Sequence, residues 1–327
     1  SSAASDVYKR QYFMSAFFLL AGYFTPQAIE RKGAGYFLKD RLIRLGIPII
    51  IYSSLIINLN QVVLGVWMRE RPFQWLFKYH AGHLWFLQAL LLFAVIYVLC
   101  RFVMNRTMIK HPLQFCSDRF SSIRVLNWSI VLLALLTFVI RIKYPVGKWV
   151  FPGFQPAHFS HYAFSFFVGI LAYYGDWFNR LRRDQARRRG IVILIMLPLF
   201  FVPMILGRIL GSDATGTTSF FVGGLHWQAF AYAVWESVML ISVLIFLLYL
   251  FRERFNRSSP LLQLMASSVY TVYIIHQTVL IAFNVLFLPV GIPTILKFFI
   301  VSLIVSPLCF GLAVLIRKIP YAKMVLG

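Results

Sequence analysis

Acidic residues and long hydrophilic segments are both scarce in this chain of 327 residues. It has 10 Asp and Glu against 32 Lys and Arg, and no polar stretch is long enough to bury a hydrophobic core of its own. The three cysteines have neither the spacing of a metal site nor that of a secreted disulfide framework. A glycine-rich phosphate loop, HExxH and GxSxG are also absent from the sequence. These absences exclude the familiar soluble enzyme classes, and we expect no metal.

Hydrophobic residues dominate instead, since they make up 60% of the chain and aromatic residues 17%. The mean hydropathy of +0.76 lies far above that of soluble domains. A net charge of +22 is compatible with nucleic-acid binding, but the basic residues form short clusters between apolar runs rather than one basic face. We therefore expect membrane lipids as partners and no nucleic acid.

The apolar runs have the length of membrane spans. A helix needs about 20 residues to cross the hydrocarbon layer, and in lipid only helices and closed barrels satisfy every backbone polar group. Seven runs reach this length and two shorter ones are plausible spans. The sequence thus predicts an all-α, polytopic transmembrane helix bundle with about nine spans, at residues 45–67, 82–104, 123–141, 190–210, 226–251, 261–288 and 292–316, with the shorter ones at 11–29 and 159–175.

Lys and Arg concentrate in alternate loops, which sets an orientation because cytoplasmic loops carry the excess. The count places the C-terminus in the cytoplasm and assigns Arg141 to an external loop. Nine spans then put the N-terminus outside, although Lys9 and Arg10 flank the first apolar run. We expect that a first helix precedes this segment in a ten-span parent protein. Residues 1–11 are expected to be non-native or disordered, and residues 12–327 to form the membrane domain.

Two ionisable residues lie deep inside predicted spans, where a charge costs several kcal/mol and often marks a functional path. Glu236 follows Tyr232 by four residues and shares a helical face with it, and His276 shares a face with Tyr273 and Gln277. The two spans run in opposite directions, so Glu236 and His276 can meet at similar depth. They are either catalytic residues on an interior path or hydrogen-bonded structural residues that join helices.

Arg41 and Arg44 stand three residues apart in KDRLIRLGIP, just ahead of a span. Paired guanidinium groups suit bidentate binding of phosphate, although a basic helix start is also ordinary membrane anchoring. The second explanation applies more strongly to Arg187, Arg188 and Arg189, which have the features of solvated anchors beside anionic lipid.

Polar and aromatic residues near the predicted external ends of spans are candidates for binding a polar substrate, namely His83, Trp85, His158, His161 and Tyr273. Stacking or hydrogen bonds to an extracytoplasmic ligand are within the chemistry of these side chains. The alternative is that each lone His or Trp anchors the helix at the headgroup level.

Five segments, in order, resemble the integral membrane acyltransferase family 3, the group that includes glucan biosynthesis protein C. They are FFLLAGYFTPQAIERKGAGYFLKDRLIRLGIP, HLWFLQALL, FSFFVGILAYY, WQAFAYAVWES and SSVYTVYIIHQTVL. The resemblance extends from about Tyr12 to near the end of the chain. It implies a ten-helix O-acyltransferase of the inner (plasma) membrane that moves an acetyl or succinyl group from cytoplasmic acyl-CoA to a hydroxyl of an extracytoplasmic glycan.

The resemblance also implies roles for individual residues. Arg41 and Arg44 would hold the phosphates of acetyl-CoA or succinyl-CoA, while Glu236 and His276 would belong to the interior path. The usual catalytic histidine of the family lies in its first helix, which this segment does not contain. We therefore expect the 327-residue chain to be inactive alone. The competing functions are a proton-coupled transporter or lipid-linked sugar flippase, for which no internal repeat is visible, and a non-catalytic scaffold.

Overall fold

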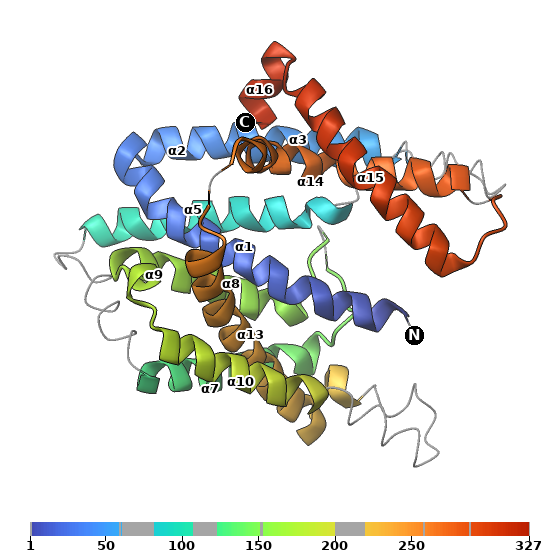
Figure 1. Ribbon diagram of the computed structural model, residues 1–327. Helices are drawn as coiled ribbons and strands as arrows, with labels where there is room; N and C mark the ends of the chain where they lie inside the picture. Colours follow the sequence, from blue (N-terminus) through green and yellow to red (C-terminus); the bar gives the residue numbers. More distant parts are fainter. Residues whose placement is uncertain are drawn as a thin grey trace. The chain divides into compact units, whose positions relative to one another are not determined.

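The computed structural model describes residues 2–58, 60, 82–106, 123–150, 153–199, 220–257, 259–287 and 289–326. Within these ranges all elements of regular secondary structure are helices, and the sole β contact is an isolated bridge between Val150 and Phe154. The chain divides into two compact units (Figure 1). The first contains residues 1–34 and 96–256, and the second contains residues 35–95 and 257–327. The predicted all-α class is confirmed.

Many large apolar side chains are exposed, which is unusual for a water-soluble protein. Large apolar residues such as Trp128 and Leu132 are 72% and 67% exposed, and Leu303 is 79% exposed. Meanwhile Arg141 and Glu236 have no exposed surface at all. Apolar side chains on the outside find favourable contacts in lipid, whereas polar groups in a membrane protein pack toward the interior. The chain is therefore a helical membrane protein.

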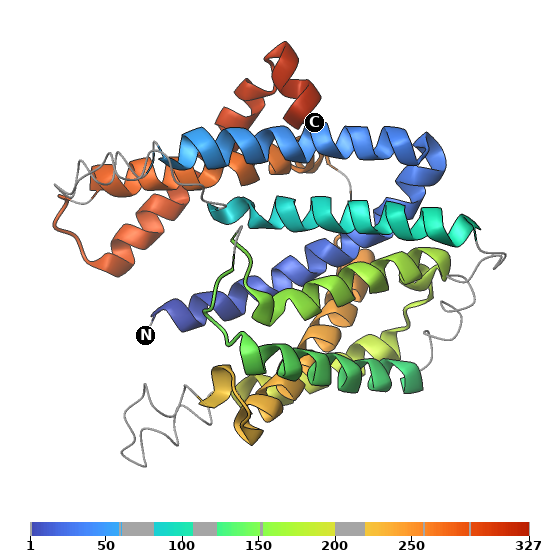
Figure 2. The same cartoon turned by 180° about the vertical axis from the view of Figure 1, so that it is seen from behind.

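The first unit is a packed group of helices (Figure 2). Helix α8 contacts both α1 and α7, and α13 contacts α7 and α10. The second half of α5 (Trp85–Arg106) also belongs to this unit. Its other helices are α1 (Ser2–Lys32), α7 (Ile123–Lys143), α8 (Pro156–Tyr174), α9 (Trp177–Arg180), α10 (Arg183–Leu199) and α13 (Trp227–Arg254).

Helices α1 and α8 approach each other closely because two glycines face each other's backbones. A methyl group built on Gly22 would overlap the carbonyl of Phe166, and one built on Gly169 would overlap the carbonyl of Leu19. Small residues at a crossing let two membrane helices pack backbone against backbone. This contact fixes α8, which carries His158 and His161, against α1.

The second unit begins with a helix that changes its winding several times. It runs through α2 (Ala34–Arg41), the π-turn η1 (Leu42–Gly46), α3 (Ile47–Ile51) and a second π-turn η2 (Tyr52–Ile56). Such π-turns inside helices occur frequently at functional sites. A short 3₁₀ turn, η4 (Gly82–Leu84), leads into α5, and the unit is completed by α14 (Pro260–Phe287), α15 (Thr294–Ile316) and α16 (Pro320–Leu326).

A small apolar core joins three of these segments. Leu45 and Tyr52 come from the winding helix, Leu84 from η4, Leu87 from the start of α5, and Ile274 from α14. Together with α14 packing on α15, this core sets the helices that carry the second polar cluster described below.

The helices follow the predicted spans closely. Four of the described helices are long and apolar enough to cross a membrane, namely 82–103 and the whole of α13, α14 and α15. Helices α1, α7 and α8 coincide with three further predicted spans. Parts of the spans predicted at 45–67 and 190–210 lie outside the described residues. Residues 2–11 continue α1, and the proposal that residues 1–11 are non-native stays a prediction.

Candidate functional site

The arginine pair lies where a proline interrupts the hydrogen bonds of a helix. Pro48 has no N–H to donate to the carbonyl of Arg44, four residues earlier. The hydroxyl of Tyr270, on α14, donates to that carbonyl instead. This hydrogen bond attaches α14 beside the arginine pair.

Arg41 and Arg44 lie one turn apart, and each is held by a neighbour on the same helix. The guanidinium of Arg41 stands over the ring of Phe37 at 5.2 Å from the ring centre. The Nε of Arg44 donates to Asp40 at 3.0 Å, and 44% of the Arg44 side chain remains exposed. Burial lowers the pKa of Arg41, so its positive charge lacks full solvation. Both arginines are thus available to an anion that competes with Asp40.

Tyr273, on α14, connects two histidines through both its hydroxyl and its backbone carbonyl. Its hydroxyl donates to the backbone carbonyl of His83. Its own carbonyl accepts from Nε2 of His83 at 2.9 Å and from Nδ1 of His276 at 2.6 Å. The two imidazole rings meet edge to face with centres 4.8 Å apart. The structure therefore brings together three of the predicted site residues in the second unit.

The carbonyl partner fixes which nitrogen of His276 can act as a base. A carbonyl oxygen only accepts, so Nδ1 of His276 must carry the hydrogen. In the neutral ring Nε2 then holds the lone pair that takes up a proton. His83 faces two acceptor oxygens, the carbonyl of Tyr273 at Nε2 and the side-chain amide oxygen of Gln277 at Nδ1, so its tautomer is not fixed by these contacts. His276 is half-buried, which allows a reactant to reach it.

Further polar contacts extend the cluster along the winding helix. The hydroxyl of Tyr52 lies 3.4 Å from the Gln277 amide oxygen, and its ring meets that of His83 at 4.7 Å. The Asn60 amide donates to the Thr278 hydroxyl at 3.1 Å. Tyr270, Tyr273 and Gln277 follow each other along α14, so polar groups continue from Arg44 past the two histidines.

His83 stands at the start of the span 82–103, where the sequence placed it. It contacts Tyr273 and Gln277 near the middle of α14. At a rise of 1.5 Å per residue, Tyr273 stands ~20 Å along a helix of ~42 Å. Trp85 reaches this cluster through one intervening ring. The ring centres of Trp85 and Phe86 are 6.4 Å apart, and those of Phe86 and Tyr273 are 6.0 Å apart.

The first unit holds a separate cluster around a buried ion pair. Nη1 of Arg141 lies 2.5 Å from Oε2 of Glu236, and both side chains have 0% exposure. Nε of Arg141 donates to the Ala157 carbonyl at 3.2 Å. The guanidinium also stands 5.4 Å from the centre of the Tyr232 ring. Tyr232 and Glu236 lie on one buried face of α13, as their spacing predicts.

The two histidines of α8 belong to this same cluster. Nη2 of Arg141 lies 3.3 Å from Nδ1 of His158, and Ser160 lies 3.5 Å from Nδ1 of His161 and 2.8 Å from Thr137. His158 and His161 are 3% and 0% exposed. Within the described residues, their Nε2 atoms have no hydrogen-bond partner. The expected role of both histidines as contacts for an external substrate stays a prediction, and their burial does not favour it.

Glu236 lies in the first unit and His276 in the second, each with its own polar neighbours, and the expectation that the two residues meet stays a prediction. Arg141 was missed because charge counting assigned it to an external loop. Its signal was present in the sequence, since a glutamate deep in a span requires a cationic partner. Arg141 directly follows the apolar run LLTFVI, close enough to the membrane to provide one.

Comparison with known families decides the classification. A family model described as an acyltransferase domain matches residues 8–317. The chain belongs to acyltransferase family 3. Searches of curated proteins and of solved structures gave no match. As a family 3 member, the chain is a membrane acyltransferase, which confirms the resemblance seen in the sequence.

Proposed function

We propose that this family 3 acyltransferase moves an acetyl or succinyl group from cytoplasmic acyl-CoA to a hydroxyl of an extracytoplasmic glycan. It would act in the inner (plasma) membrane with its C-terminus in the cytoplasm. The observation that supports this most directly is that α14 carries both polar contacts in the second unit. Tyr270 donates to the carbonyl of Arg44, and Tyr273, one turn further along the same helix, holds His276.

Arg41 and Arg44 suit the donor end of this path. Guanidinium groups bind phosphate with two parallel hydrogen bonds, and acyl-CoA carries several phosphates. Arg44 already pairs with Asp40 at an exposed surface, where such pairs contribute at most about 1 kcal/mol. A phosphate can therefore displace the carboxylate at little cost. The attachment of Tyr270 to the Arg44 carbonyl keeps this turn next to α14.

His276 suits the transfer step. The glycan hydroxyl oxygen attacks the thioester carbonyl carbon, and the hydroxyl proton passes to Nε2 of His276. As the carbon–sulfur bond breaks, the coenzyme A thiolate leaves and takes up that proton. Tyr273 holds Nδ1–H of His276 and thereby presents Nε2 as the base. His83 acts as a positioning residue through the same carbonyl.

Glu236 is better suited to positioning than to proton transfer. Its carboxylate lies against Arg141 at 2.5 Å with both side chains fully buried, so its charge is already neutralised. We propose that the pair holds His158 and α8 in place within the first unit. Of the two roles that the sequence allows for Glu236, this is the structural one, in which it joins helices, and Arg141 is its partner.

Acyl-CoA binding by the purified chain tests the donor assignment. Replacing Arg41 and Arg44 together with Ala should weaken binding at least tenfold while membrane insertion and folding stay unchanged. Arg183→Ala with Arg187→Ala is the matched control, because both arginines are exposed on α10. Binding that is unaffected by the first pair of changes, or weakened equally by the control pair, would contradict the assignment. If the protein acylates no glycan, and the Arg41 and Arg44 variant loses proton-driven transport, the transporter function would be favoured instead.

A further inference from the structure

A cavity of about 390 Å³ lies in the first unit, apart from both polar clusters. Its wall is apolar and comes from α8, α10 and α13, with Val168, Val192, Leu244 and Leu248 among its residues. A volume in this range is that of a small-molecule site. The polar residues of the lining are concentrated on the segment from α9 to α10, apart from Ser129 on α7.

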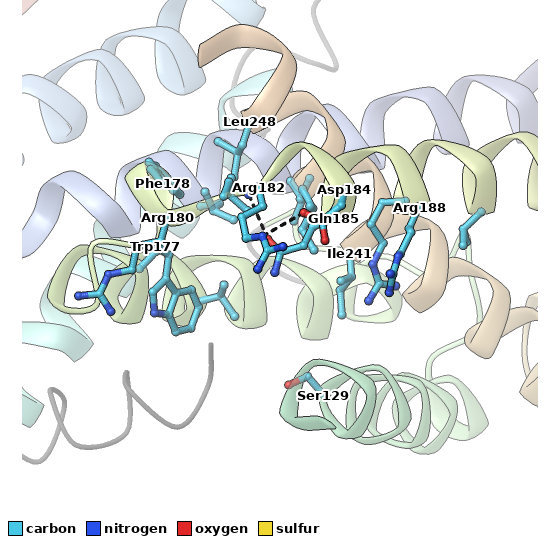
Figure 3. Close-up of a pocket in the computed structure, with 18 of the residues that line it drawn as sticks. Ser129, Trp177, Phe178, Arg180, Arg182, Asp184, Gln185, Arg188, Ile241 and Leu248 are labelled. Carbon is cyan, nitrogen blue, oxygen red and sulfur yellow. Dashed lines mark hydrogen bonds and ion pairs between the residues drawn. The ribbon is translucent and has the colours of Figure 1, made fainter. Parts of the chain in front are cut away.

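One rim of the cavity is strongly basic (Figure 3). Arg180, Arg182, Arg188 and Arg189 all line it, and Figure 3 shows Arg180, Arg182 and Arg188 along the segment from α9 to α10. Arg182 is paired with Asp184 at 3.1 Å. Within the described part of the chain, Arg180, Arg188 and Arg189 have no carboxylate partner. Arg189 is half-buried, and this burial lowers its pKa. The rim thus holds three cations that lack an anion.

Arg252 at the end of α13 fixes this rim. Its guanidinium donates to the carbonyls of Phe178 at 2.5 Å, Asn179 at 3.1 Å and Leu181 at 2.7 Å. Helix α9 and the residue that follows it are therefore held at the cavity by three hydrogen bonds from one side chain. This attachment fixes the position of Arg180, as an anion site requires.

We propose that this cavity binds an anionic phospholipid, with the lipid phosphate on Arg180, Arg188 and Arg189 and one acyl chain along the apolar wall. Arginine recognises phosphate through paired hydrogen bonds, and basic pockets between membrane helices bind anionic headgroups. The apolar wall selects a ligand with a hydrocarbon chain over free phosphate. The site is independent of the proposed transfer path, since it shares none of the residues of that path.

Binding of phosphatidylglycerol with a fluorescent acyl chain to the purified chain in neutral detergent tests this proposal. Phosphatidylcholine with the same label should bind at least tenfold more weakly. Replacing Arg180, Arg188 and Arg189 with Gln should weaken phosphatidylglycerol binding at least tenfold. Arg183→Gln with Arg187→Gln removes two exposed charges outside the cavity and should have an effect below twofold. If both variants lose the same amount of phosphatidylglycerol affinity per charge removed, the lipid is attracted to the basic surface in general, and the proposed site is wrong.

Filling the cavity tests the apolar half of the site without changing the charge. Val192→Trp places an indole in the wall and should weaken phosphatidylglycerol binding at least tenfold. Ile191→Trp is the matched control, since Ile191 is the next residue on α10, is exposed and does not line the cavity. Melting temperatures of both variants would report their folding. Wild-type affinity in a folded Val192→Trp variant would overturn the proposal, as would displacement of the lipid by coenzyme A or inorganic phosphate alone.

Discussion

The first unit buries an arginine and a glutamate completely, whereas the second holds two histidines that are only half-buried. In the first, Arg141 and Glu236 neutralise each other at 2.5 Å. In the second, the histidines share a backbone carbonyl, and His276 keeps a basic nitrogen. A closed ion pair contributes to folding, while an accessible imidazole can exchange protons with a substrate. The difference favours the proposed division of roles, in which the first cluster holds helices in place and the second carries out the transfer.

The largest expected effect is on chemistry in the second unit. His276→Ala should lower acyl transfer by about 10²- to 10⁴-fold, the range of a general base. Binding of acyl-CoA should change less than twofold, because Arg41 and Arg44 are untouched. Surface glycan acylation is measured in cells that express the native open reading frame. A wild-type transfer rate would remove His276 from the mechanism.

Stability in the first unit gives the next largest effect. Arg141→Ala leaves Glu236 buried without its cation, which costs about 3–5 kcal/mol in comparable buried pairs. Thermal unfolding in detergent should show this loss, together with reduced yield of folded protein. Arg141→Met combined with Glu236→Leu removes both charges and should recover most of the stability. If the single variant folds normally but loses only transfer, the pair belongs to the chemistry after all.

A glycine-to-alanine change at the close contact of α1 with α8 should destabilise the protein more than the same change at an open glycine of the second unit. Gly169→Ala pushes a methyl group into the Leu19 carbonyl and should destabilise the protein by about 1–3 kcal/mol. Gly311→Ala, in α15, is the control, because a methyl group there meets nothing within 4 Å. It should be neutral or stabilising by less than about 1 kcal/mol. Equal melting temperatures for the two variants would contradict the tight crossing.

Removing the hydroxyl of Tyr273 or of Tyr52 should have the smallest effects on the transfer rate, and the effect at Tyr273 should be the larger of the two. Tyr273→Phe removes the hydroxyl that donates to His83 and should lower transfer several-fold, equivalent to about 1 kcal/mol. Tyr52→Phe removes a weaker contact, since its hydroxyl lies 3.4 Å from Gln277, and should have less effect. Steady-state transfer rates decide the order. A larger loss in Tyr52→Phe would mean that Gln277, rather than Tyr273, orients the histidines.

The sequence predicts the helices well because the bilayer imposes their length. Runs such as 292–316 and 261–288 end within two residues of α15 and α14. The shared face of Tyr273, His276 and Gln277 also follows from helical spacing alone. These features depend on positions within one helix, where the period of 3.6 residues is enough to place side chains.

Contacts between helices are harder to predict. Depth along a span can be estimated from the sequence, but depth does not specify which helices are adjacent. Arg141 follows an apolar run and was counted as a loop charge, although its partner lies 95 positions later in the sequence. His83 starts a span, yet it packs halfway along α14. Each of these depends on tertiary pairing, which a single sequence does not record.

Pro48 also bears on how the winding helix is joined to α14. Proline removes one backbone donor from a helix and is a common place for a bend. On the N-terminal side of this proline, the hydroxyl of Tyr270 donates to the carbonyl of Arg44. One turn further along α14, Tyr273 holds the two histidines, so a single helix anchors both the arginine pair and the histidine pair.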